Sequence, residues 1–271
     1  MIENITIGSD PEFFLFSELE TKFISAIDMF PGDKQNPHKI TEEGHAIQVD
    51  GIGCEFNIPP CTTADDFHKE IKFVMDYMND TIIKPKGLLI SPKASALFKA
   101  DQLNDKRAWE IGCSPDINAW TLDTNNPKEY VDKMRAVGGH VAVGYTNPDA
   151  YLSFEMIKAM DLFLGVPSVL LDKDTKRREL YGKAGAMRIT PFGLEYRVLS
   201  NFWIFDEVLT KWVFDNTIKA AEFINIQGFI SNPEEIQECI NTGNKKLALE
   251  IIDDYKIEIP TLNRKEEYDF A

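Results

Sequence analysis

Apolar residues alternate with polar ones over several short stretches of the chain, a pattern typical of β-strands. The strands that this alternation predicts cover residues 5–7, 13–16, 23–27, 46–50, 54–58, 140–145, 186–190 and 194–199. They come in adjacent groups rather than in a regular alternation of strand and helix. We therefore expect an antiparallel sheet rather than a doubly wound parallel one.

A helical period of about 3.6 residues replaces this alternation in the remaining segments. The predicted helices cover residues 64–78, 148–163, 206–223, 233–240 and 245–255. In the first of these, Phe67, Ile71 and Met78 fall on one face, and Thr63 with Asp66 is typical of a helix cap. Strands and helices together predict the α+β class.

Composition narrows the possible functions. Hydrophobic residues make up 44% of the chain and aromatic residues 11%, which excludes a disordered chain. The 271 residues include 29 Lys and Arg against 44 Asp and Glu, giving a formal net charge of −15. This balance argues against binding of duplex nucleic acid, which needs clustered cations.

Three further features of the sequence concern membrane-spanning segments, secretory signals and paired cysteines. The longest apolar stretch, residues 162–171, contains Pro167 and is too short to span a bilayer. The N-terminus does not have the pattern of a secretory signal. The four cysteines show no CxxC spacing, so we expect a reducing compartment and a cytoplasmic protein without a membrane partner.

Three segments place polar residues where a strand would bury apolar ones. With a period of two, Asp10 and Glu12 share a face, and neighbouring carboxylates repel unless a cation lies between them. Glu55 lies in an otherwise apolar strand, and His140 opens another after two glycines. Simpler explanations remain open: a solvated strand entrance, an outward glutamate and a structural histidine.

The basic segment 177–198 is the most informative. Glu195 and Arg197 share one face of a predicted strand, and Arg188 lies on the preceding strand, across a turn. A carboxylate beside two guanidinium groups suits a metal-bound polyphosphate, although a plain cross-strand ion pair also explains it. Oxygen ligands with a single imidazole favour Mg²⁺ or Mn²⁺ over zinc. The sequence contains no P-loop motif and no GxSxG motif.

The order of these motifs resembles the glutamine synthetase and glutamate–cysteine ligase superfamily. The matching segments are Asp-Pro-Glu-Phe-Phe at 10–14, Cys-Glu-Phe-Asn at 54–57, Gly-Gly-His at 138–140 and Glu-Tyr-Arg at 195–197. The chain is most similar to the branch of phage-associated carboxylate–amine ligases, also called COOH-NH2 ligases or amidoligases. The resemblance covers about residues 5–205, most of the chain.

This resemblance implies a fold like the glutamine synthetase catalytic domain. A curved, mainly antiparallel sheet would hold ATP and two or three divalent metals on its concave face, with helices packed on its convex face. The chain 1–271 would be a single ligase domain, with the catalytic sheet at about 5–205 and C-terminal helices at about 206–262.

The resemblance also assigns roles to individual residues. The expected metal ligands are Asp10, Glu12, Glu55, His140 and Glu195. Arg188 and Arg197 are expected to bind phosphate and, with Glu195, to act in catalysis; Arg178 and Lys183 are expected as further ATP-binding cations. Two departures stand out: Asp10 replaces the glutamate of glutamine synthetases, and Asp50 precedes Glu55 at a shorter spacing.

The implied activity is formation of an amide or isopeptide bond by an ATP-dependent carbon–nitrogen ligase. A substrate carboxylate would attack the γ-phosphorus to give an acyl phosphate and ADP, and an amine would then attack the acyl carbon. The expected cofactors are ATP and Mg²⁺ or Mn²⁺. The expected partners are small-molecule or peptide carboxylates and amines, in the host cytoplasm if the protein is phage-encoded.

Two alternatives stay open. The chain could be a ligase-fold binding protein without catalysis, or a metal-dependent phosphoesterase, which would not need arginines beside the last carboxylate. The loop at 112–120 could line a substrate pocket or lie on the surface. The oligomeric state and the identity of the substrates are not predicted.

Overall fold

The structure is a computed structural model that describes residues 1–109, 116–125, 133–226 and 230–262. Its strands are β1 (Thr6–Ser9), β2 (Glu12–Ser17), β3 (Lys22–Ile24), β4 (His38–Lys39), β5 (Ala46–Asp50), β6 (Gly53–Asn57), β7 (Leu89–Ser91), β8 (Ser95–Leu97), β9 (Asp116–Asn118), β10 (Thr124–Asn125), β11 (Met134–Ala136), β12 (Val141–Gly144), β13 (Ala186–Thr190) and β14 (Gly193–Tyr196). Its α-helices are α1 (Ala64–Met78), α2 (Ala150–Met160), α3 (Val166–Leu171), α4 (Arg177–Leu180), α5 (Glu207–Ile226), α6 (Pro233–Thr242) and α7 (Lys245–Tyr255).

The described strands form two larger sheets and one small one. The first sheet has the order β1-β12-β14-β13-β9-β10. The second has the order β3-β2-β6-β5-β4, with β7 also paired to β2, and β8 pairs with β11 alone. The named strands of the described chain pair antiparallel throughout, so the predicted α+β class with antiparallel sheets is confirmed.

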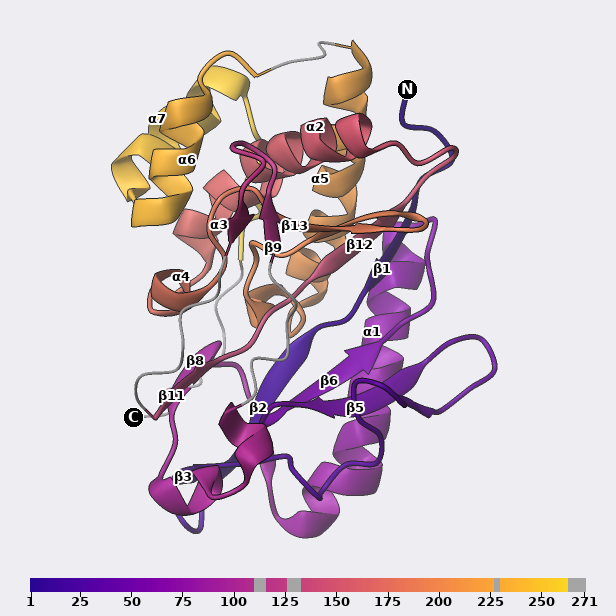
Figure 1. Cartoon of the computed structure of the whole chain (residues 1–271), viewed down its shortest axis with the longest axis vertical. Coiled ribbons are helices and arrows are strands. Elements are labelled where there is room, and N and C mark those ends of the chain that lie inside the picture. Colours follow the sequence, from indigo (N-terminus) through magenta and orange to yellow (C-terminus); the bar gives the residue numbers. More distant parts are fainter. Residues whose placement is uncertain (110–115, 126–132, 227–229, 263–271) are drawn as a thin grey trace.

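Backbone hydrogen bonds join the two larger sheets where β1 passes into β2. The amide of Phe56 donates to the Pro11 carbonyl at 3.2 Å, and the amide of Ile58 donates to the Ser9 carbonyl at 3.2 Å. On the other side, the amide of Glu12 donates to the Gly138 carbonyl at 2.9 Å. Strands β5, β6, β1, β12, β14 and β13 therefore follow one another across a connected surface (Figure 1).

The strand register separates this surface into an apolar face and a polar face. Ile47 is paired with Phe56, and Val141 with Tyr196, and all four side chains are fully buried. Because side chains alternate along a strand, the residues between them point to the opposite side. The apolar face therefore belongs to the main core, and the opposite face carries the charged residues of the strands.

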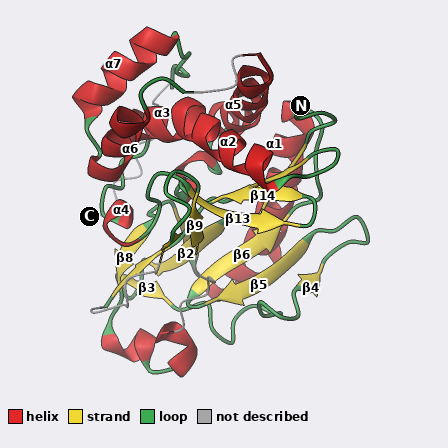
Figure 2. Ribbon diagram, turned by 45° about the horizontal axis from the view of Figure 1, so that its top comes forward, coloured by secondary structure: helices red, strands yellow, loops and turns green. Residues whose placement is uncertain are grey.

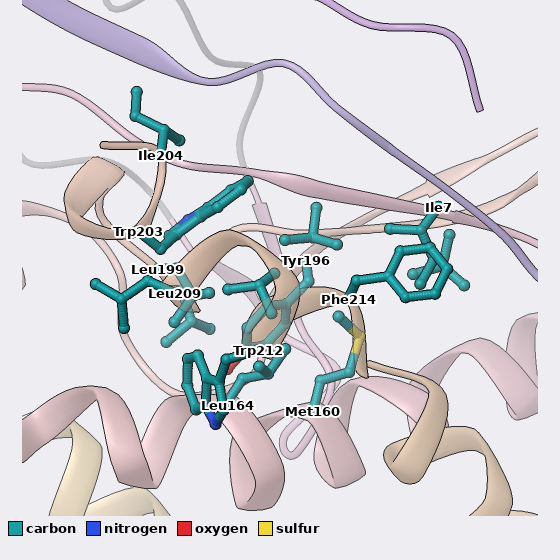
Figure 3. Packing of buried hydrophobic residues seen from close by; sticks show 14 of the residues in the cluster. Ile7, Met160, Leu164, Tyr196, Leu199, Trp203, Ile204, Leu209, Trp212 and Phe214 are labelled. Atoms are coloured by element: carbon teal, nitrogen blue, oxygen red, sulfur yellow. The ribbon is translucent and has the colours of Figure 1, made fainter. Parts of the chain in front are cut away.

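Helices cover the apolar face. Helix α5 packs against both α1 and α2, and α2 also contacts β14. Figure 2 shows α2, α3, α5, α6 and α7 gathered on one side of the strands. At the centre, Phe67 of α1 stacks on Trp203 with ring centroids 5.7 Å apart and planes 11° apart. Figure 3 shows Trp203 and Tyr196 in this core together with Trp212 and Phe214.

A buried carboxylate beneath the sheet fixes the β13–β14 hairpin. Asp161 lies in a π-helical turn (Asp161–Gly165) that follows α2 and is fully buried. It accepts hydrogen bonds from Tyr196 Oη at 2.9 Å, Trp120 Nε1 at 2.6 Å and the Gly185 amide at 2.6 Å. Burial raises the pKa of Asp161 to about 7, although these donors lower it. The hairpin is thus held from the core side.

The structure confirms several predicted helices and strands, whereas others begin or end at different residues from those predicted. The predicted helices 64–78 and 245–255 and the strand 186–190 have the predicted bounds. The helix predicted to 163 ends at Met160, and a π-helical turn leads into α3, which accepts Pro167 in its first turn because no amide donor is needed there. The short strands β4, β7, β8, β9, β10 and β11 were not predicted.

Two further observations concern the whole described chain. Among the described residues, no helix combines the length and the apolar character that crossing a membrane requires. Cys54, Cys61 and Cys239 are buried free thiols, and Cys113 lies outside the described residues.

The central aromatic stack gives a stability prediction. We expect Phe67→Ala to lower the free energy of unfolding by about 3–5 kcal/mol, because it removes a fully buried ring and leaves a cavity. The control is Phe73→Ala on the same helix, where the ring is 43% exposed and the expected loss is about 1 kcal/mol or less. Urea unfolding followed by circular dichroism measures both; equal losses would contradict the assignment of the core.

Candidate functional site

Charged residues from both larger sheets converge on the polar face, around a cavity of about 280 Å³. The cavity lies where β1 passes into β2, the place where the two sheets join. Its described lining residues are Asp10, Glu12, Lys34, Pro37, Gln48, Asp50, Glu55, Asn57, His140, Arg188 and Arg197.

Three carboxylates form one group at this cavity. Glu12 of β2 is paired directly with Glu55 of β6, and Asp50 ends the neighbouring β5. One oxygen from each lies within 4.8 Å of the others. Glu12 Oε2 accepts a hydrogen bond from the Gly138 amide at 2.9 Å, whereas the buried Glu55 Oε2 accepts none from any residue that the structure describes.

A second group combines two carboxylates with an imidazole. His140 Nδ1 lies 3.7 Å from Asp10 Oδ1 and 3.6 Å from Glu195 Oε1. Asp10 Oδ1 is buried and accepts no hydrogen bond from the described residues. Four of the five predicted metal ligands, Asp10, Glu12, Glu55 and His140, line this cavity, and the fifth, Glu195, lies beside Asp10 and His140.

The glycines before His140 permit this approach, as the sequence predicts. A Cβ at Gly138 would lie 2.5 Å from His140 Nε2, and one at Gly139 would lie 2.5 Å from the Ser200 carbonyl oxygen. His140 itself lies just before β12 and not within the predicted strand 140–145, and Arg197 lies just after β14. The antiparallel register nevertheless keeps both side chains on the polar face, beside Asp10.

Arginines approach the second group from the β13–β14 hairpin. Arg188 is paired directly with Glu195, and its guanidinium donates to Glu195 Oε2. Arg197 donates to Glu195 Oε1, and its Nε lies 2.5 Å from Asp116 Oδ1. The cross-strand ion pair that the sequence left open is therefore present, and it lies within the acidic site.

Burial shifts the pKa values of carboxyl groups and of the histidine at this cavity. Desolvation raises the pKa of Glu12 to about 7, and nearby Asp50 adds to the shift. Desolvation, together with the charges of Asp10, Asp50 and Glu12, raises the pKa of Glu55 well above its usual value. Burial and Arg197 lower the pKa of His140 well below 6.5, so its imidazole is neutral.

These features fit divalent cations. Oxygen donors dominate both groups, and the single imidazole is unprotonated, as metal ligation requires. Buried carboxylate oxygens of Glu55 and Asp10 have room for a ligand besides the protein. The donor set suits Mg²⁺ or Mn²⁺ better than zinc, which prefers nitrogen and sulfur ligands.

Arg178 and Lys183 lie away from the cavity that the other predicted residues surround. The Arg178 guanidinium is buried on the helical side, where it donates to Ser168 Oγ at 2.9 Å. Lys183 Nζ donates to the Asn241 carbonyl at 3.1 Å. Neither lines the cavity. Arg178 also donates to the Ile240 carbonyl at 3.5 Å, so both cations tie the segment before β13 to α6, and their role in ATP binding stays a prediction.

Other residues of the site were missed. Lys34 reaches the cavity from the turn before β4, and Gln48 and Asn57 share a face with Glu55. The period of two would have found the last pair, but no local pattern marks Lys34. Of the loop 112–120, residues 112–115 lie outside the described residues, whereas Asp116 contacts Arg197.

Arg177 was also missed, because it looks like one of several cations in a basic segment. Its side chain is 3% exposed and donates to the carbonyls of Val137 at 2.7 Å and Val198 at 2.9 Å. It lies on a smaller cavity of about 50 Å³ that shares Glu12, Asp50 and His140 with the larger one. Arg177 therefore holds together the chain segments that carry His140 and Arg197.

Comparison with known families identifies the class of protein. Residues 130–269 match the family described as phage phiEco32-like COOH.NH2 ligase-type 2, and this match spans just over half of the chain. The chain belongs to this family of carboxylate–amine ligases. The matched range includes His140 and the arginine hairpin but not Asp10, Glu12 or Glu55, and it extends beyond the predicted 5–205 through the C-terminal helices.

The chain is also similar to solved structures. The chain is similar to the crystal structure of a bifunctional glutathione synthetase from Pasteurella multocida, with a TM-score of 0.46 and 11% sequence identity. The similarity covers 93% of this chain and 49% of that chain, so the chain spans about half the length of that protein. A search of curated protein sequences finds no match.

The raised carboxyl pKa values predict how stability depends on pH. A folded-state pKa above the unfolded value of 4.5 gives stability at low pH that is lost as pH rises through the folded pKa. Between pH 6.5 and 8, Glu12 should cost the metal-free protein on the order of 1 kcal/mol, and Glu55 adds to this loss. His140 stays neutral throughout this range.

Thermal unfolding in EDTA and in Mn²⁺ measures this effect. We expect the melting temperature in EDTA to fall from pH 6.5 to pH 8, and the increase caused by Mn²⁺ to grow, because the metal binds the ionised carboxylates. Glu12→Gln should flatten both trends. A metal-free protein that becomes more stable over this range would contradict the assignment.

Proposed function

We propose that the protein is an ATP- and divalent-metal-dependent carboxylate–amine ligase with a glutamine synthetase-like catalytic sheet. The chain would form one catalytic unit, with its C-terminal helices packed behind the sheet. Membership of the ligase family supports the reaction class. The substrates would be a small-molecule or peptide carboxylate and an amine.

One observation carries this proposal: acidic and basic groups line a single cavity together. The two carboxylate groups offer hard oxygen ligands, while Arg188, Arg197 and Lys34 line the same cavity. Joining a carboxylate to ATP brings two anions together, so such a reaction needs cations on both sides. An acidic protein would bind an anionic nucleotide through the cations that it holds.

Each residue has a specific task in this scheme. Glu12, Asp50, Glu55, Asp10, His140 and Glu195 would hold the metals, which supply positive charge to the phosphate oxygens when bound. Arg188 presents its guanidinium from the more open part of the site, with a side chain 40% exposed, and would bind the γ-phosphate. Arg197 would stabilise the charge that develops on the transferred phosphoryl group.

The proposed reaction exchanges bonds in two steps. The substrate carboxylate oxygen would attack the γ-phosphorus, and the bond to the bridging oxygen of ADP would break. The amine nitrogen would then attack the acyl carbon, release inorganic phosphate and lose a proton. Net, one ATP and the two substrates give an amide, ADP and phosphate.

The second candidate function is metal-dependent phosphoester hydrolysis. The paired carboxylate groups favour it, because two-metal hydrolases use similar ligands. That chemistry does not need the two arginines bound to Glu195, and the family match supports a ligase instead.

A coupled assay separates these functions. Purified protein would be incubated with ATP, Mg²⁺, pooled amino acids and pooled polyamines, and ADP release would be measured. We expect ADP release that requires both a carboxylate and an amine. Phosphoester hydrolysis without ATP would support the hydrolase, and ATP binding without turnover in any pool would support a non-catalytic binding protein.

Arg188→Ala is the sharpest test of the phosphate-binding role. We expect kcat to fall about a hundredfold or more, with the melting temperature little changed, because the side chain is partly exposed. Arg197 is less suitable, since its removal leaves Glu195 and Asp116 without their buried cation. Arg107→Ala, at an exposed arginine outside the cavity, is the control. Unchanged turnover by Arg188→Ala would contradict the role.

A further inference from the structure

Lys34 reaches the candidate site from a turn that the family motifs do not include. Of the described residues that line the larger cavity, it is the only lysine. Its Nζ lies 2.9 Å from Asp50 Oδ2, and the two side chains are 35% and 10% exposed. A lysine therefore holds one of the three carboxylates that form the first candidate metal group.

The turn that carries Lys34 is fixed to the sheet. Asp33 Oδ1 accepts hydrogen bonds from the amides of Gln35 and Asn36, both at 2.9 Å. The preceding Gly32 has φ +84°, and a Cβ there would lie 2.5 Å from the His38 amide nitrogen. The Val49 amide of β5 also donates to the Gly32 carbonyl at 3.4 Å, and Asp33 forms a β-bridge with Val49, so the backbone before Lys34 is held against β5.

The same arrangement occurs on the other side of the cavity. Arg188 and Arg197 bind the two oxygens of Glu195, a member of the second candidate metal group. From the strand order, β5 with Asp50 lies on one side of the carboxylates and β14 with Glu195 on the other. On each side, a protein cation occupies a carboxylate that a divalent metal would also bind.

We propose that Lys34 is an exchanging cation of this site. Without metal, its ammonium neutralises Asp50; once a divalent cation binds Asp50, the ammonium is released and binds the polyphosphate of the nucleotide. Lys34 would then hold the phosphate chain from the side opposite to Arg188 and Arg197. The assignment rests on the proposed function, because it requires a metal-bound nucleotide in the cavity.

This exchange has a consequence that a structural role lacks. Removing the ammonium removes a competitor for Asp50, so a metal ion alone should bind more tightly. It also removes a donor to phosphate, so the nucleotide should bind more weakly. A lysine that merely held the turn in place would, when lost, weaken both.

The test compares Lys34→Met with the wild type in two binding measurements. Mn²⁺ binding without nucleotide is measured by electron paramagnetic resonance, and we expect it to be about threefold tighter or more in the variant. ATP binding at saturating Mg²⁺ is measured by calorimetry, and we expect it to be about tenfold weaker. Lys34→Arg should retain much of the nucleotide affinity.

Lys39→Met is the matched control, because Lys39 is exposed on the adjacent β4 and does not line the cavity. It removes the same charge and should leave both affinities unchanged. If Lys34→Met weakens Mn²⁺ binding, or leaves ATP binding as in the wild type, the exchange is overturned while the ligase proposal stands. If the wild type binds no ATP at saturating Mg²⁺, the proposed function and the exchange both fall.

Discussion

Repulsion among buried carboxylates is the constraint on which the rest of this structure depends. At an effective dielectric constant of about 20, two unit charges 4.8 Å apart repel by about 3.5 kcal/mol, and each candidate metal group contains at least two carboxylates at such separations. Protons, the side chains of Lys34, Arg188 and Arg197, and added cations are the available means of relieving this repulsion. The fold thus maintains a cavity whose charge is balanced only in part by the protein itself.

The sheet register makes this concentration of charge possible. Pairing of Glu12 with Glu55 and of Arg188 with Glu195 places the charged side chains on one face, while Phe56, Tyr196 and their neighbours enter the core on the other. Most predicted strands and helices followed from local alternation and helical period. Local patterns could not predict that the two larger sheets join, because the joint depends on backbone hydrogen bonds between segments far apart in the chain.

Part of the candidate site, like part of the fold, could be predicted from local sequence patterns. Glu12, Glu55 and Glu195 stand at strand positions where apolar residues are expected, and Asp10 and His140 lie directly beside strands, so their pattern and order pointed to them. Lys34 comes from a turn and Asp116 from the short strand β9, where no period constrains the sequence. Only the tertiary structure brings Lys34 to the cavity and Asp116 to Arg197. Arg178 and Lys183 show the converse: a basic segment does not reveal which of its cations face the site and which anchor helices.

Carboxylates from distant segments converge in this cavity, where we propose that they hold divalent cations. Anomalous diffraction from crystals of the protein grown with Mn²⁺ tests it most directly. We expect manganese peaks within about 2.5 Å of carboxylate oxygens in both groups, at Glu12 and Glu55 and at Asp10 and Glu195. A cavity without manganese, in crystals where Mn²⁺ binds at other carboxylates, would contradict it.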